Sequence, residues 1–169
     1  MPLTPRRRGL LLAAVTLSLL ALLWAHRLAV VGALVAWRFD DVPALSPGAL
    51  AAMSPPPVIL DARSPAEFAV GHLAGATRVD LAHPEDALRA LPAGRAVVVV
   101  CAVGYRSGVV ARALRAKGFR DVRNLRGGIF AWAAEGREMV GEGGPTRAVH
   151  PYRPGWGMLR ARGSQPSAR

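Results

Sequence analysis

A run of five apolar residues, Ala96 to Val100, constrains the fold of this 169-residue chain more than any other feature. The run has the length of a strand and contains no polar residue, so both of its faces must be buried. Strands of this kind lie in the middle of parallel sheets that helices cover on both sides. The run therefore predicts an α/β domain with this strand at its centre.

Segments of strand and helix character alternate around this run. Further strands are expected at 58–61, 76–79 and 121–124, and helices at 65–70, 84–91, 107–117 and 128–134. The helix over 107–117 is expected to bury Val109, Val110, Ala113 and Leu114. The alternation favours a mainly parallel sheet, and functional sites in such sheets lie at the carboxyl ends of the strands.

Residues 39–57 are rich in proline and are interpreted as a linker with one short first element. Ser46 is expected to cap a small helix, because its hydroxyl can accept a hydrogen bond from a backbone N–H of the first turn. Pro47 suits the first helical position, and the prolines after Met53 end the helix.

The amino-terminal segment, residues 1–38, is interpreted as a membrane anchor. Seventeen residues without a charge, Gly9 to Ala25, follow three arginines. As a helix they would extend over roughly 26 Å, nearly the thickness of a bilayer core. A span over 9–25 places Arg27 at the interface rather than at the membrane centre, where a charge costs ~2.5–3.5 kcal/mol. A cleaved signal peptide is the alternative, and the protein would then be soluble in the periplasm.

Positive charge decides the expected orientation of this anchor. Arg6 to Arg8 and the terminal amine precede the apolar run, whereas Arg27 and the more distant Arg38 follow it. The side with more positive charge stays in the cytoplasm. The sequence therefore predicts a single-pass protein of the inner (cytoplasmic) membrane with its folded domain in the periplasm.

The net charge of +11 does not point to nucleic acid, because of where it lies. Residues 1–38 and 145–169 each contain five arginines and no acidic residue, whereas 39–144 contain 12 basic and 11 acidic residues. The domain itself is thus nearly neutral, and no nucleic-acid partner is expected. The basic tail over 140–169 carries aromatic residues that could touch lipid headgroups, fold back on the domain or contact an unknown protein partner.

Cysteine and histidine usage excludes several kinds of site. Cys101 is the only cysteine, which rules out an intramolecular disulfide and a Cys-rich zinc site. The four histidines are scattered without paired spacing, so we expect no metal, and nothing suggests a cofactor.

Cys101 follows the buried strand directly and stands at a strand-to-helix turn. The amides of the turn, the positive end of the following helix and Arg106 would all stabilise a thiolate over a thiol. Gly104 allows the backbone to curl so that successive N–H groups point inward, an arrangement that also binds oxyanions. The position favours a nucleophile over a cysteine that merely fills the core.

Three motifs resemble single-domain rhodaneses, the sulfurtransferase family. The first is the loop Cys101-Ala102-Val103-Gly104-Tyr105-Arg106-Ser107; the second runs from Asp61-Ala62-Arg63 through Glu67-Phe68 to Gly71-His72; the third is Gly127-Gly128 followed by Ala131-Trp132. They stand in the family's order and together cover residues 43–139.

The resemblance implies a three-layer α/β/α fold with a central parallel five-stranded sheet, preceded here by a transmembrane helix. It also implies a persulfide on Cys101, formed from thiosulfate or a related sulfur-containing anion and passed to cyanide or a thiol. The substrate-binding loop would comprise Ala102, Val103, Gly104, Tyr105, Arg106 and Ser107, with Arg106 attracting the anion. Asp61, Arg63 and His72 are assigned supporting roles, of which an ion pair for the first two and a structural hydrogen bond for His72 are favoured.

Two other functions could use the same residues, that of a phosphatase and that of a noncatalytic module. A phosphatase on the same fold would carry its arginine at the sixth place after the cysteine, whereas Arg106 is fifth, so the smaller, sulfur-sized loop is favoured. A noncatalytic module that binds a partner or carries a persulfide would have the same loop chemistry, and the sequence does not separate it from an enzyme.

Overall fold

The computed structural model describes residues 5–81, 86 and 94–151. Its helices are α1 (Pro5–Ala25), α2 (Arg27–Arg38), α3 (Pro47–Ala51), α4 (Pro65–Val70), α6 (Tyr105–Ala116) and α7 (Gly128–Ala134). Its strands are β1 (Ala44–Leu45), β2 (Val58–Asp61), β3 (Thr77–Arg78), β4 (Val97–Val100), β5 (Val122–Leu125), β6 (Met139–Gly141) and β7 (Gly144–Thr146). The helix expected at 84–91 lies outside the described residues, apart from Asp86.

Five parallel strands form the central sheet, as expected, and their order is β1-β5-β4-β2-β3. β4 lies in the middle, and all four of its valines are buried. Its register pairs Val99 with Leu60 of β2 on one side and with Asn124 of β5 on the other. The wholly apolar run is therefore the centre of the fold, and it ends at Cys101.

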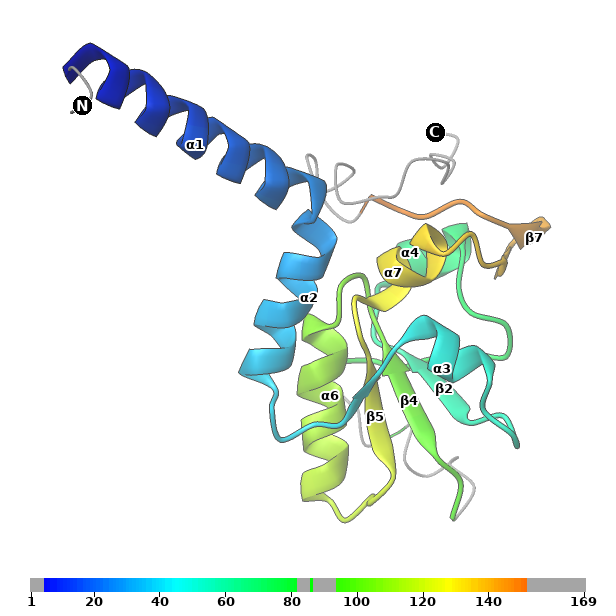
Figure 1. Ribbon diagram of the computed structural model, residues 1–169. Coiled ribbons are helices and arrows are strands. Elements are labelled where there is room, and N and C mark those ends of the chain that lie inside the picture. Colours follow the sequence, from blue (N-terminus) through cyan, green and yellow to red (C-terminus); the bar gives the residue numbers. More distant parts are fainter. Residues whose placement is uncertain (1–4, 82–85, 87–93, 152–169) are drawn as a thin grey trace.

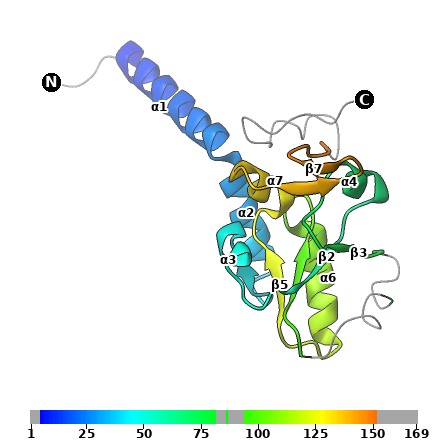
Figure 2. The ribbon, with the colours of Figure 1, turned by 90° about the vertical axis from the view of Figure 1, so that its right-hand side faces the viewer.

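Two apolar cores lie on the two faces of this sheet, because successive side chains of a strand point to opposite faces. Val97, Val99 and Cys101 belong to the core beneath α6, and Val98 and Val100 belong to the core beneath α3 and α7. Figures 1 and 2 show these helices on opposite sides of the strands. The three-layer α/β/α arrangement is confirmed.

α6 differs in two details from its expected form. It begins at Tyr105, two residues early, because Gly104 makes the turn into the helix in a single left-handed step. It buries Val110, Ala111 and Leu114, whereas Val109 is half exposed. The expectation that Val109 faces the core is wrong, since the buried stripe runs at the i, i+3, i+4, i+7 spacing from Ser107.

α1 projects away from the domain and none of its residues is buried (Figure 1). By length and composition it could cross a membrane, as an anchor or as a signal sequence could. α2, which holds the second apolar run, packs on the domain instead: Gly32 is buried, and Val31 and Val35 contact the two cores. Phe39, just beyond α2, is buried against α6, and Arg112 of α6 pairs with Asp41.

Beyond residue 139 the chain stays in contact with the domain. β6 and β7 pair as an antiparallel hairpin, and Val140 bridges to His72. Val149 is fully buried in the core that contains Met139. The first ten residues of the segment interpreted as a tail thus help to cover one end of the domain. The small cap at Ser46 is present as expected, with its hydroxyl accepting from Ala49 N at 3.1 Å.

Candidate active site

Cys101 lies at the carboxyl end of β4 and is 1% exposed. Its Sγ accepts a hydrogen bond from Gly104 N at 3.1 Å and lies 3.3 Å from Ser107 Oγ. Among the backbone amides expected to surround the sulfur, the amide of Gly104 donates this hydrogen bond. The loop therefore curls around a single sulfur atom, with a backbone donor and a hydroxyl on it.

Gly104 makes this curl possible. Its φ is +104°, a conformation that L side chains rarely adopt. A Cβ there would lie 3.3 Å from Val35 Cγ1 of α2 and 3.5 Å from Leu125 O. Glycine thus meets a conformational and a steric requirement at once, and α2 braces the outer side of the loop.

The other predicted loop residues divide into buried and exposed ones. Ala102 and Val103 are buried, and the carbonyls of Cys101 and Ala102 accept from the first amides of α7, Ile129 N at 2.8 Å and Phe130 N at 3.2 Å. Tyr105 is 52% exposed and packs edge-on against Phe39, with ring centroids 5.4 Å apart. It therefore lies on the rim of the loop.

Arg106 is held by a carboxylate that sequence reasoning gave no role. Its Nη1 and Nη2 donate to Glu67 Oε2 and Oε1 at 2.8 and 2.7 Å. The side chain of Glu67 is 4% exposed and that of Arg106 19%. Burial alone would raise the pKa of Glu67, but the hydrogen bonds from Arg106 and Ser64 outweigh it and lower that pKa to about 2. The charge of Arg106 is thus largely balanced within the protein.

Glu67 also helps to cap the amino end of α4. Its Oε2 accepts from Ser64 N at 3.1 Å, and Ser64 Oγ accepts from Glu67 N at 3.3 Å, a reciprocal capping box. The pattern Ser-Pro-x-Glu predicts such a box from sequence alone. The partnership with Arg106, 39 residues away, has no local signal.

Asp61 and Arg63 form the ion pair that the sequence favoured. Arg63 Nε and Nη2 donate to Asp61 Oδ1 and Oδ2 at 2.9 and 2.7 Å, and Nη2 also donates to Gly71 O at 2.7 Å. Both side chains are almost fully buried. The hydrogen bonds of this pair tie the end of β2 to the turn after α4.

His72 has the structural role that the sequence favoured. Its Nδ1 lies 2.9 Å from Phe68 O, and its ring stacks on that of Phe68 with centroids 3.7 Å apart. Its backbone pairs with Val140 of β6. In the described part of the chain, no group of three or more His, Cys, Asp or Glu side chains is placed to hold a metal.

Asn124 of β5 belongs to the site, although sequence reasoning did not select it. Its Nδ2 donates to Gly104 O at 2.8 Å, and its Oδ1 accepts from Ser107 Oγ at 2.8 Å. Asparagine is uncommon in strands. Its presence in the strand expected at 121–124 is a sequence signal that could have identified Asn124.

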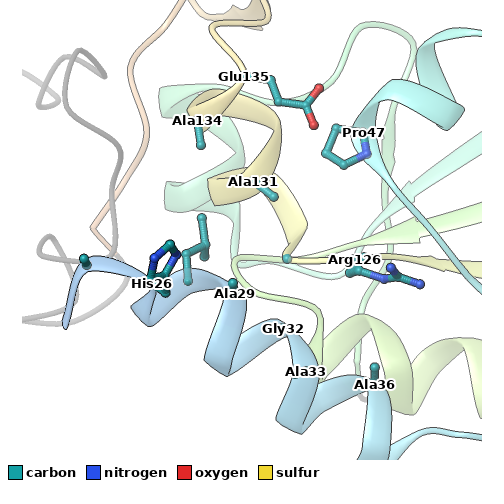
Figure 3. Close-up of a pocket in the computed structure, with 13 residues that line it drawn as sticks. His26, Ala29, Gly32, Ala33, Ala36, Pro47, Arg126, Ala131, Ala134 and Glu135 are labelled. Atoms are coloured by element: carbon teal, nitrogen blue, oxygen red, sulfur yellow. The ribbon is translucent and has the colours of Figure 1, made fainter. Parts of the chain in front are cut away.

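An apolar groove lies between α2 and α7, apart from the sulfur. Its cavity volume is about 830 Å³, and its walls carry mainly small side chains, with His26, Arg126 and Glu135 at its edges (Figure 3). Cys101 is not among the lining residues. The sulfur of Cys101 therefore lies at the loop and outside this groove.

We expect Glu67→Gln to lower the free energy of unfolding at pH 7 by about 1–3 kcal/mol, because Arg106 then loses a buried carboxylate partner. Ionised Glu67 stabilises the fold fully above its ordinary pKa of 4.5, and less as the pH falls toward about 2. Thermal unfolding of the detergent-solubilised chain should therefore show a difference that shrinks over this range.

Glu135→Gln is the matched control, because its pair with Arg137 is exposed and should contribute under about 1 kcal/mol. Equal stability of Glu67→Gln and wild type at pH 7 would show that the buried pair does not hold the loop.

Comparison with known proteins agrees with this geometry. A family model described as "Rhodanese-like domain" matches residues 46–135. A "Sulfurtransferase" of Allochromatium vinosum is 36% identical over 83 residues, which cover 49% of this chain and 78% of that protein. A "Thiosulfate sulfurtransferase GlpE" of Pseudomonas fluorescens is 33% identical over 88 residues, covering 52% and 81%.

Other relatives are longer or are known as structures. The match to "Probable adenylyltransferase/sulfurtransferase MoeZ" of Mycobacterium tuberculosis spans only 20% of that protein, at 35% identity over 46% of this chain. The rhodanese-like domain of the Alr3790 protein from Anabaena sp. superposes with a TM-score of 0.54 at 28% identity, covering 59% of this chain and 79% of that one. On the extent of the family match and the identity to these sulfurtransferases, the chain belongs to the rhodanese-like domain family.

Proposed function

We propose that this protein is a sulfurtransferase that carries sulfane sulfur as a persulfide on Cys101. The observation that carries the proposal is the placement of the only cysteine at the end of the central strand, where Gly104 N and Ser107 Oγ surround its sulfur. Hydrogen-bond donors beside a cysteine favour its thiolate, which is the nucleophilic form. The names of the relatives supply the reaction class.

The proposed reaction has two steps. The Cys101 thiolate attacks the outer sulfur of thiosulfate, a new S–S bond forms, and the bond to sulfite breaks with sulfite keeping the electron pair. Cyanide or a thiolate then attacks the outer sulfur of the persulfide and releases the Cys101 thiolate. No net oxidation occurs, because one sulfur atom passes between two nucleophiles.

Arg106 and the loop amides would receive the anionic donor. Glu67 balances the charge of Arg106. We therefore propose that Arg106 contributes to donor binding mainly by holding the shape of the loop, which directs the backbone N–H groups, and less through its net charge. The donor's negative charge would be met mainly by backbone amides and the start of α6, which carry partial positive charge.

Incubation of the full chain with thiosulfate should add one sulfur atom, about 32 Da, because Cys101 would accept it covalently. Intact-mass spectrometry measures this directly, and cyanide should remove the added mass. Cys101→Ser is the control. A variant that still gains the mass would contradict the assignment, since no other thiol exists in the chain.

We further propose that α1 anchors the protein in the inner membrane with its amino end in the cytoplasm and the sulfur site in the periplasm. The three arginines in the first turn of α1, ahead of its apolar run, support this orientation, and the absence of buried residues along α1 supports its role as the anchor. Continuity between α1 and α2, which packs on the domain, would keep the site close to the membrane surface (Figure 2).

Topology can be tested on Cys101 itself. With the outer membrane permeabilised, a thiol reagent that does not cross membranes should label Cys101 in intact cells, because the domain would face the periplasm. Lysed cells provide the control for a reactive, folded thiol. Labelling that appears only after lysis of the inner membrane would place the domain in the cytoplasm.

A further inference from the structure

Four hydrogen-bonding contacts form a closed ring that includes the sulfur of Cys101. Gly104 N donates to Sγ at 3.1 Å, and Asn124 Nδ2 donates to Gly104 O at 2.8 Å. Ser107 Oγ donates to Asn124 Oδ1 at 2.8 Å and lies 3.3 Å from Sγ. Asn124 is the member of the ring that does not touch the sulfur, yet it contacts both residues that do.

The ring fixes which way the Asn124 amide points. An amide oxygen can only accept and an amide nitrogen can only donate, so the nitrogen must face the carbonyl of Gly104. The hydroxyl of Ser107 then donates to the oxygen. If the amide were turned over, Oδ1 would face Gly104 O, and two acceptors would oppose each other. The amide is therefore locked in one orientation.

Burial makes this arrangement costly to lose. Asn124 is 4% exposed and Ser107 fully buried, so water does not readily replace a missing partner. The backbone of Asn124 is also fixed, because β5 pairs with β4 and Asn124 N donates to Pro43 O at 2.8 Å. The strand next to the one that carries Cys101 thus holds the far side of the loop.

Gly104 is the residue through which this support reaches the sulfur. Its carbonyl accepts from Asn124 and also from Gly108 N of α6 at 3.0 Å, so it is held from two directions. Holding this carbonyl fixes the left-handed turn at φ +104°, and the turn directs Gly104 N–H at Sγ. The donor is in place before the sulfur becomes charged, which is how preorganised donors stabilise developing negative charge.

We propose that Asn124 is a positioning residue for sulfur chemistry at Cys101, acting through Gly104 to hold the backbone donor on the sulfur. This inference rests on the proposed function in taking Cys101 as the nucleophile. Ser107 orients the Asn124 amide, Asn124 holds Gly104, and the Gly104 amide stabilises the thiolate both before attack and as the leaving group when the persulfide is discharged.

Alkylation of Cys101 by iodoacetamide tests the proposal without requiring sulfur transfer. Asn124→Leu in the full, detergent-solubilised chain should slow alkylation near neutral pH about threefold to tenfold, the range that one hydrogen bond of ordinary strength supports. At about pH 10, which favours the thiolate in either protein, the slowing should disappear or reverse, because a thiolate without this donor is the stronger nucleophile. Intact-mass spectrometry follows the reaction.

The charged groups on the elements around the loop remain unchanged in this variant. They include the buried pairs of Glu67 in α4 with Arg106 in α6, and of Asp61 at the end of β2 with Arg63. Arg123→Leu is the matched control, because it alters the neighbouring residue of β5 on the opposite face and should leave the alkylation rate unchanged.

Two further variants separate positioning from a merely structural role. Asn124→Asp keeps the size and the acceptor for Ser107 but exchanges the donor to Gly104 for a carboxylate, and it should slow alkylation near neutral pH more than Asn124→Leu does, because its negative charge adds to the loss of the donor. The slowing by Asn124→Leu should persist in a Ser107→Ala background, because it acts through Gly104. Its disappearance there would overturn the proposed route.

Other outcomes also contradict the proposal. Faster alkylation at both pH values would show that Asn124 only closes the loop against solvent. An unchanged rate in both Asn124 variants, with wild-type melting temperatures, would show that Asn124 does not act on the sulfur.

The experiment also separates this proposal from the proposed function. Slowed alkylation in a protein whose wild type never gains sulfur from thiosulfate would support the role of Asn124 and refute the proposed function.

Discussion

Burial of β4 in the middle of the sheet is the constraint on which the rest of the structure depends. Its four valines pack into the two cores, and its backbone pairs with β2 on one side and β5 on the other, so the strand is held from four directions. That rigidity fixes Cys101 at the carboxyl edge of the sheet. The loop that follows can then curl around the sulfur, because β5 and α7 meet it from either side.

Each loop residue is supported by a partner from a different part of the chain. Glu67 of α4 holds Arg106, Asn124 of β5 holds Gly104 and Ser107, and Val35 of α2 packs where a side chain on Gly104 would be. The sulfur is thus placed by secondary-structure elements and not by the loop alone. Support of this kind is expected where a reactive group must keep its geometry.

Local patterns predicted most of the fold, and contacts between distant residues explain what they missed. The apolar run of β4, the proline start of α4 and the glycines before α7 are all readable within a few residues. The hairpin of β6 and β7 has no alternation of apolar and polar residues, so it carries no strand signal. Cys101 could be selected from its position, whereas the roles of Glu67 and Asn124 depend on partners that only folding brings close.

Steady-state formation of thiocyanate from thiosulfate and cyanide tests the central claim most directly, when it is measured beside hydrolysis of an aryl phosphate. A catalytic persulfide on Cys101 predicts many turnovers by the full chain, none by Cys101→Ser, and no phosphate release by either protein. A single stoichiometric transfer without turnover would indicate a carrier instead of an enzyme, and phosphate release that depends on Cys101 would contradict sulfur transfer as the function.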